Sequence, residues 1–343
     1  MTMREVFGDS SELVRNCRDV PGGEAWLASV PELIDRSVER WSLRIEGDVR
    51  LAQGTASVVL AVRCPDDTPA VLKLGLPHME ATHEAQGLRF WDGTPTVRLL
   101  APDEADEADD VMLLERCHPG TPLSTLPEEE QDEIIASLLR ELWRSPGAEE
   151  PTPAPTVDLD AFRPLSEMLA YWGDEVRQRT VKRSNATTHD ETTGDSALPA
   201  PADIDPGLLD TARIEPAPLG SAINDPALLD TALSLFEELP RTAAHTVLLA
   251  TDLHAGNVLR AERRPWLVID PKPFLGDPAY DVTQHLLNCG ERMAADPLGL
   301  VSRIAALAGL DAGRVRLWMF ARAATTSPES HRLWRDVARS LAP

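Results

Sequence analysis

Two aspartates and one asparagine carry the chemistry that the rest of the chain has to position. Asp252 and Asn257 lie close together in the sequence, and Asp270 follows after a predicted hairpin. Carboxylate and amide oxygens are hard ligands of the kind that Mg²⁺ prefers, together with phosphate oxygens. A carboxylate beside such an ion can orient a hydroxyl group and accept its proton. The three side chains therefore predict phosphoryl transfer, with Asp252 as the base and with Asn257 and Asp270 as metal ligands.

Short strands are predicted to bring these side chains to one end of a hairpin. Apolar runs at 246–249 and 266–269 indicate two strands, a third extended piece begins at 258–259, and a charged turn follows at 261–265. Asp and Asn are also common turn residues, so each of the three has a structural explanation when it is taken alone. Their joint spacing favours the catalytic interpretation.

A lysine inside an apolar run adds a second candidate group. Lys73 lies within the predicted strand 70–74, where it points either to solvent or inward towards a phosphate. The next segment, 79–91, predicts a helix that carries Glu84. Protein kinases pair a strand lysine with a helix glutamate and direct the ammonium at the nucleotide phosphates, and this arrangement favours the inward alternative.

The predicted strand 111–114 ends close to a Pro119–Gly120 turn. In a kinase, a strand that passes into a turn between two lobes offers backbone groups to adenine. We therefore predict a sheet-rich N-terminal lobe at 1–116 and a helical lobe at 117–343. The candidate nucleotide-binding residues at this junction are Leu114, Glu115 and Cys117.

Three further residues are weaker candidates for contacts with the substrate. His254 either contacts phosphate or substrate or satisfies backbone groups of its loop. Lys272 either neutralises the metal aspartate, touches phosphate or faces solvent. Asp277 either binds a cationic acceptor or stabilises a turn.

Composition narrows the partners. The chain has 343 residues and a net charge of −23, so nucleic acid is an improbable partner because phosphate backbones bind basic surfaces. An acidic cleft would attract a polycationic small molecule, although an acidic surface also serves solubility. No apolar run has membrane-spanning length, the N-terminus lacks a signal core, and the four cysteines form no C-x-x-C pair; we expect a cytoplasmic protein without membrane contact.

The remaining pattern predicts an α+β chain with two lobes. We expect a small antiparallel sheet with strands near 43–45, 49–51 and 58–62, besides those named above. A helix at 23–41 is predicted to be interrupted by Pro31. Helices of the second lobe are predicted at 127–143, 159–181, 226–239, 283–289, 298–307, 315–325 and 331–341. Residues 184–224 have few large apolar groups and predict a mobile insertion.

Two stretches carry a family resemblance. Thr251–Asn257 (TDLHAGN) and Val268–Cys289 (VIDPKPFLGDPAYDVTQHLLNC) resemble the aminoglycoside phosphotransferases, in particular the aminoglycoside/hydroxyurea antibiotic resistance kinases, a branch that includes streptomycin 6-kinases. The resemblance covers most of the chain except 184–224. It implies a bilobal protein-kinase-like fold, ATP and Mg²⁺ as cofactors, and phosphorylation of a small-molecule hydroxyl, with a cationic antibiotic such as streptomycin as the acceptor. Where the family usually has a histidine, this chain has Ala250.

Three alternatives stay open at this point. The acceptor is hydroxyurea or another small hydroxyl metabolite, the chain is an inactive nucleotide-binding module, or it is a protein kinase. The last is disfavoured because the chain lacks the His-Arg-Asp, Asp-Phe-Gly and Ala-Pro-Glu motifs of protein kinases.

Overall fold

The computed structural model describes residues 12–46, 52–53, 56–101, 111–143, 159–190, 226–326 and 331–343. The chain forms two compact units. The first contains residues 1–164 and 245–281, and the second contains residues 165–244 and 282–343. The lobe boundary at residues 116–117 stays a prediction.

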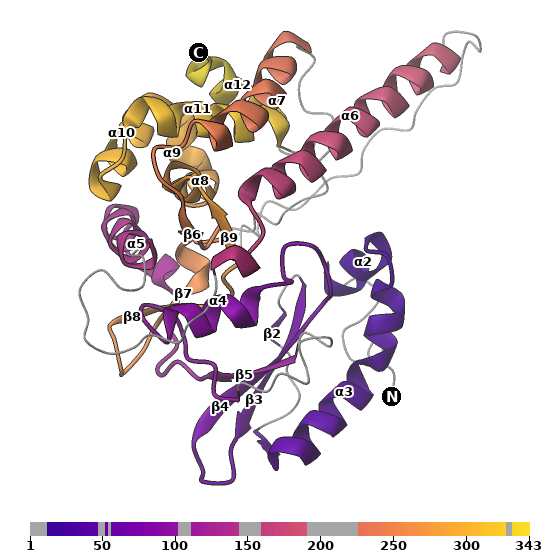
Figure 1. The fold of residues 1–343 in the computed structure, drawn as a ribbon, viewed down its shortest axis with the longest axis vertical. Helices are drawn as coiled ribbons and strands as arrows, with labels where there is room; N and C mark the ends of the chain where they lie inside the picture. Colours follow the sequence, from indigo (N-terminus) through magenta and orange to yellow (C-terminus); the bar gives the residue numbers. More distant parts are fainter. Residues whose placement is uncertain are drawn as a thin grey trace, which may run out of the picture. The chain divides into compact units, whose positions relative to one another are not determined.

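An antiparallel sheet is the main element of the first unit (Figure 1). Its strands follow the order β1-β3-β4-β5, and β2 also pairs with β3. Alternate residues of β3 from Val58 on are buried, because successive residues of a strand face opposite sides, whereas the last four residues of β4 are all buried. The strand bounds are Arg44–Ile45 for β1, Ala52–Gln53 for β2, Ser57–Arg63 for β3, Pro69–Gly75 for β4 and Val111–Glu115 for β5. The predicted strand at 49–51 lies outside the described residues.

Two helices complete the core of the sheet. Helices α2 (Glu12–Asp19) and α3 (Gly23–Trp41) share a buried cluster with β3, β4 and β5. A Cβ on Gly23 would lie 2.3 Å from the carbonyl oxygen of Cys17, so glycine is required for the close approach of the two helices. The predicted interruption at Pro31 was wrong, because α3 continues through it.

The same unit contains helix α4 and the elements of the predicted hairpin. Helix α4 (Glu84–Trp91) begins later than predicted, since residues 79–83 form turns. Strand β7 (Val258–Arg260) pairs with β8 (Trp266–Val268), as the charged turn between them predicts. Strand β6 (Val247–Leu249) pairs with a strand that the sequence pattern missed, β9 (Phe274–Gly276). Helix α5 spans Glu128–Leu142, and the short helices η2 and η4 span Leu123–Thr125 and Ala255–Asn257.

The second unit is helical. Helix α11 (Ala312–Thr325) packs against α7 (Pro226–Arg241), α10 (Pro297–Ala308) and α12 (His331–Leu341). Helix α6 (Leu165–Asp190) begins after Pro164, since a proline disfavours helix in the residue before it and the short helix η3 (Leu159–Ala161) precedes it. Because α6 reaches Asp190, the first residues of the predicted insertion at 184–224 are helical. Residues 191–225 lie outside the described residues.

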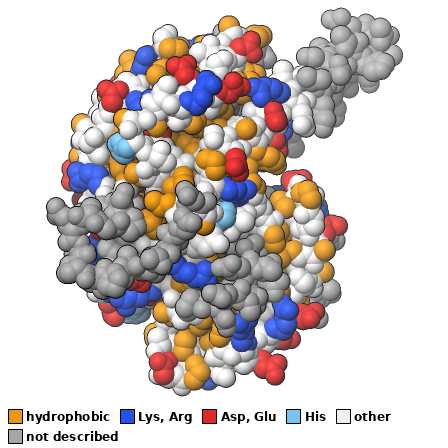
Figure 2. Space-filling view, viewed as in Figure 1, with side chains coloured by type: hydrophobic (Ala, Val, Ile, Leu, Met, Phe, Trp, Pro, Cys, Tyr) orange, Lys and Arg blue, Asp and Glu red, His pale blue; other side chains and the backbone are white. Residues whose placement is uncertain are grey.

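Charged side chains of both signs are mixed over the face that Figure 2 shows. Acidic, basic and hydrophobic side chains are all present among the residues described on this face. None of the helices within the described ranges is long and apolar enough to cross a bilayer.

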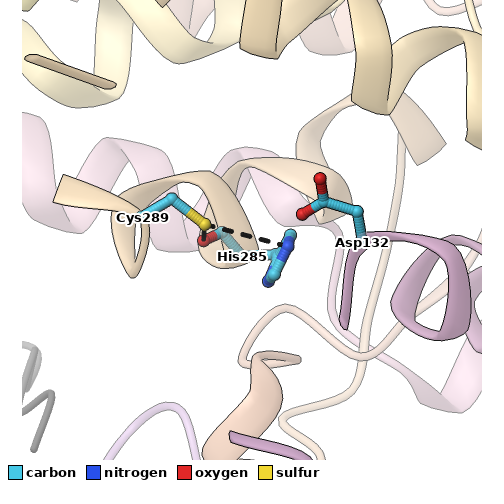
Figure 3. A group of neighbouring side chains, drawn as sticks. All are labelled: Asp132, His285 and Cys289. Atoms are coloured by element: carbon cyan, nitrogen blue, oxygen red, sulfur yellow. Dashed lines mark hydrogen bonds between the residues drawn. The ribbon is translucent and has the colours of Figure 1, made fainter. Parts of the chain in front are cut away.

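A histidine and a cysteine meet where α8 (Pro278–Leu287) leads into α9 (Gly290–Ala295), as Figure 3 shows. Cys289 Sγ donates to the carbonyl oxygen of His285 at 3.3 Å and lies 3.8 Å from His285 Nε2. The same carbonyl oxygen also accepts from Asn288 N at 2.9 Å, so the thiol is a second donor to it.

Candidate active site

Four charged side chains form a closed network in the first unit, which we call the charged ring. Lys73 Nζ lies 2.5 and 2.6 Å from the two carboxylate oxygens of Glu84 and 2.6 Å from Asp270 Oδ1. Lys272 Nζ also contacts Asp270 Oδ1 and lies 3.7 Å from Glu84 Oε2. Lys73, Glu84 and Lys272 are buried, and about a third of the Asp270 side chain is exposed. The strand lysine and helix glutamate thus meet as expected, and the solvent-facing alternative for Lys272 was wrong.

Contact with opposite charges keeps Asp270 and Lys272 ionised. Burial alone would raise the pKa of Asp270, but the adjacent Lys272 and Lys73 ammonium groups hold it well below its usual range. Burial would likewise lower the pKa of Lys272, and the carboxylates of Asp270 and Glu84 raise it above its usual range. Opposite charges in contact favour the charged forms of both partners. Asp270 is therefore a carboxylate and Lys272 an ammonium at neutral pH.

The loop after β6 carries the predicted base and the asparagine. Asn257 Nδ2 donates to the backbone oxygen of Asp252 at 3.0 Å and to its Oδ2 at 3.4 Å. These bonds fix the amide so that Asn257 Oδ1 is its acceptor atom. The amide N–H of Ile269 donates to Asn257 O at 2.9 Å, which ties this loop to the residue before Asp270. The backbone thus connects Asp252 and Asn257 to the ring.

A buried aspartate holds the start of the loop. Asp281, on the first turn of α8, accepts from Thr251 N at 2.7 Å and from Ala250 N at 3.1 Å. Trp143 Nε1 also donates to Asp281 at 2.9 Å. Thr251 has a φ of 49°, a left-handed conformation that is costly for a β-branched residue and persists only where neighbouring bonds impose it. Sequence reasoning missed that this carboxylate anchors the residue before Asp252.

The backbone of Lys272 is held at both ends. Its N–H donates to Ala250 O at 2.8 Å, and its carbonyl accepts from Thr251 Oγ1 at 2.6 Å. The next residue, Pro273, packs against α4 so closely that a Cβ on Gly87 would lie 2.3 Å from Pro273 Cγ. The helix that carries Glu84 and the segment that carries Lys272 are therefore in direct contact.

The three residues predicted to bind nucleotide occupy the end of β5. The side chain of Leu114 is buried in a cluster with Leu88 and Leu267. Glu115 is engaged by the Arg263 guanidinium, at 2.9 Å from Nε and 2.8 Å from Nη2, so its side chain has a structural partner. Burial raises the pKa of the Cys117 thiol to about 12. Contacts of this segment with adenine stay a prediction.

Two weaker candidates make local contacts. His254 Nδ1 accepts from Gly256 N at 3.1 Å at the start of η4. Asp277 is buried, and its Oδ1 accepts from Ala279 N at 3.0 Å at the start of α8. This bond is the one that an N-terminal capping aspartate makes. Roles for either residue in substrate binding stay predictions.

The donor set fits a magnesium ion. Asp270 supplies a carboxylate that stays ionised, and Asn257 presents an amide oxygen because its nitrogen is directed at Asp252. Oxygen ligands of this kind, completed by phosphate oxygens and water, are the ones that Mg²⁺ takes. A carboxylate base, hard metal ligands and a buried lysine together can perform phosphoryl transfer.

Comparison with known proteins places the chain in a family. Residues 40–219 and 211–332 match the family described as aminoglycoside/hydroxyurea antibiotic resistance kinase. A streptomycin 6-kinase from Streptomyces griseus is 33% identical over 307 residues, which cover 88% of this chain and 82% of that protein. A hydroxyurea phosphotransferase from Kitasatospora aureofaciens is 31% identical over 300 residues, covering 88% and 73%.

A solved structure supports the predicted fold class. An aminoglycoside phosphotransferase from Streptomyces rimosus, in complex with ADP and streptomycin, matches with a TM-score of 0.51 at 19% identity, over 87% of this chain and 98% of that one. At this identity the match indicates a shared fold. The fold is the bilobal kinase-like one, with an antiparallel sheet in the N-terminal region and a mostly helical remainder. The chain belongs to the aminoglycoside/hydroxyurea antibiotic resistance kinase family.

Proposed function

We propose that this protein transfers the γ-phosphoryl group of ATP to a hydroxyl group of a small cationic antibiotic, with streptomycin as the first acceptor to test. The geometry that carries the proposal is the charged ring, in which Lys73 bridges Glu84 and Asp270 at 2.5–2.6 Å. The similarity to streptomycin 6-kinases supports the choice of acceptor.

Each residue has a role in this proposal. Lys73, held by Glu84, contacts the phosphates of the nucleotide, and the backbone at the end of β5 contacts adenine. Asn257 and Asp270 hold Mg²⁺, which neutralises phosphate charge when it is bound. Asp252 orients the acceptor hydroxyl and accepts its proton as the new P–O bond forms. The bonds between Asn257 and Asp252 keep the base beside the metal ligands.

Mass spectrometry of candidate acceptors tests the proposal. The full-length protein is incubated with ATP, Mg²⁺ and separate acceptors: streptomycin, other aminoglycosides and hydroxyurea. We expect a phosphate mass gain on an antibiotic and stoichiometric ADP formation. The Arg264→Gln variant is the control: it removes one positive charge from an ion pair with Glu141, which has no role in the proposed reaction, and should phosphorylate the same acceptor.

Hydroxyurea is the second candidate acceptor, because a hydroxyurea phosphotransferase is also similar over most of this chain. Phosphate gain on hydroxyurea alone would select this candidate over the antibiotic. Binding of ATP without transfer to any acceptor of the panel would contradict both and indicate an inactive nucleotide-binding protein.

A further inference from the structure

Lys272 is, after Lys73, a second ammonium group in contact with Asp270, the residue that corresponds to a metal ligand of protein kinases. Among the described residues, the ion pairs of Asp270 all involve Oδ1, which Lys73 and Lys272 share. This arrangement leaves Oδ2 as the oxygen of Asp270 that can face a metal ion. Protein kinases place two Mg²⁺ ions on the corresponding aspartate and asparagine.

The backbone of Lys272 is fixed on both sides of its side chain. The N–H and carbonyl groups of this residue bond to Ala250 and Thr251, and prolines flank it on both sides. Proline fixes φ and restricts the residue before it. The backbone thus fixes the point from which the side chain starts, and the contacts of Nζ with Asp270 and Glu84 in a buried position hold the ammonium.

A lysine rather than an arginine at position 272 places a compact positive charge in the site. The chain contains three lysines, Lys73, Lys182 and Lys272, among 33 basic residues. Two of the three lie in the charged ring. A lysine ammonium is compact enough for two such groups to meet one carboxylate oxygen, whereas a guanidinium is a broad planar fork.

The charge of the site changes with Lys272. With this residue the ring has two positive and two negative groups; without it the ring would have one positive and two negative groups, a net charge of −1. A net negative site attracts further cations, and a neutral one does so less. Lys272 therefore weakens the attraction of the site for a further metal ion and keeps a positive charge near the phosphates.

We propose, building on the function proposed above, that the Lys272 ammonium takes the place of the second Mg²⁺ ion of protein kinases. The nucleotide then binds with one divalent cation, held by Asn257 and Asp270 Oδ2. The ammonium groups of Lys272 and Lys73, both in contact with Asp270 Oδ1, supply the remaining positive charge of the site. The residue contributes to nucleotide binding and to charge neutralisation.

Counting bound Mn²⁺ tests this proposal without relying on turnover. Electron paramagnetic resonance measures the Mn²⁺ bound per protein in the presence of a non-hydrolysable ATP analogue, as the free metal concentration rises into the millimolar range. We expect one Mn²⁺ per bound nucleotide in the wild type. Two Mn²⁺ per nucleotide would overturn the proposal.

Variants separate a metal-replacing role from a structural one. In Lys272→Gln we expect a second Mn²⁺ to bind, and nucleotide affinity at equimolar metal to fall roughly tenfold to hundredfold, as for loss of a charged hydrogen bond. The control Arg264→Gln should still bind one Mn²⁺, because it lowers the net charge equally but at an ion pair with Glu141.

The outcomes also distinguish this inference from the proposed function. A wild type that binds no nucleotide would refute both. A wild type that binds nucleotide, together with a folded Lys272→Gln variant of unchanged metal count and affinity, would refute the role of Lys272 alone. If circular dichroism shows that Lys272→Gln is unfolded, the wild-type count decides.

Discussion

Replacing Asp281 by asparagine should both destabilise the protein and slow the reaction. The Asp281 carboxylate is fully buried and accepts hydrogen bonds from Thr251 N, Ala250 N and Trp143 Nε1. Two of the three donors bond to Oδ2 and one to Oδ1. An amide has one acceptor oxygen, so Asp281→Asn best keeps the pair at Oδ2 and turns its NH₂ group towards Thr251 N.

The magnitude follows from the lost bond. A hydrogen bond to a charged group contributes about 1.5–3 kcal/mol, and leaving a buried donor unpaired has a similar cost. We expect Asp281→Asn to lower the free energy of unfolding by about 2–3 kcal/mol. Thr251 would also lose the bond that holds its left-handed conformation. A shift of the adjacent Asp252 by about 1 Å would reduce kcat roughly a hundredfold.

Urea unfolding and steady-state kinetics of two variants check this reasoning. Trp143→Phe removes one donor from Asp281 but leaves both backbone bonds, so it should cost about 1.5–3 kcal/mol of stability and change kcat by less than about threefold. Wild-type stability and kcat in Asp281→Asn would refute the anchoring role. Equal kcat losses in the two variants would show that the loop does not depend on the backbone bonds.

Three further predictions concern the surroundings of the site. Gly87→Ala should lower the melting temperature and weaken nucleotide binding, because its Cβ would lie 2.3 Å from Pro273 Cγ and overpacking costs about 1–3 kcal/mol. Alanine in an unobstructed helix would instead stabilise the protein by about 1 kcal/mol. A stabilised variant would therefore contradict the contact. Because the pKa of Asp270 is depressed, the contribution of Asp270 to stability is fully present above about pH 4 and is lost as the pH falls further. Because the pKa of Lys272 is raised, the contribution of Lys272 is fully present below about pH 10.4 and is lost as the pH rises further. The stability advantage of the wild type over Asp270→Asn, from urea titrations at several pH values, should therefore shrink as the pH falls below about 4; an advantage that stays unchanged on acidification would contradict an ionised Asp270. Iodoacetamide at pH 8 should modify Cys117 far more slowly than a free thiol, because burial raises its pKa to about 12, and mass spectrometry that found Cys117 rapidly alkylated would contradict this burial.

The charged pair of Lys73 and Glu84 could be predicted because its signals are local. A lysine inside an apolar run and a helix soon after it fix a strand and a neighbouring helix, and the structure brings the two side chains to 2.5 Å. The β7–β8 hairpin was predictable for the same reason, since a charged turn separates its two strands. Strand β9 was missed because it pairs with β6, which is distant in the sequence.

The position of Lys272 could not be derived from its spacing. Asp270 has a φ of 54°, a left-handed conformation that residue type does not predict for aspartate, and the chain direction after it depends on this angle. The start of α8 carried a signal that was not used: Asp277 followed by Pro278 matches a capping residue and a proline in the first helical position, whereas the helix was predicted to begin at residue 283. The salt bridge between Glu115 and Arg263 could not be predicted, because it joins segments that are distant in the sequence.

The most direct test of the central claim is a comparison of phosphoryl transfer and nucleotide binding in Asp252→Asn. Rapid-quench single-turnover measurements give the rate of phosphate transfer from labelled ATP to streptomycin, and calorimetry gives the affinity for the ATP analogue. If Asp252 is the base beside an intact nucleotide site, transfer should fall by about a hundredfold to ten-thousandfold while nucleotide affinity stays within about threefold. Transfer at the wild-type rate in Asp252→Asn would contradict the account.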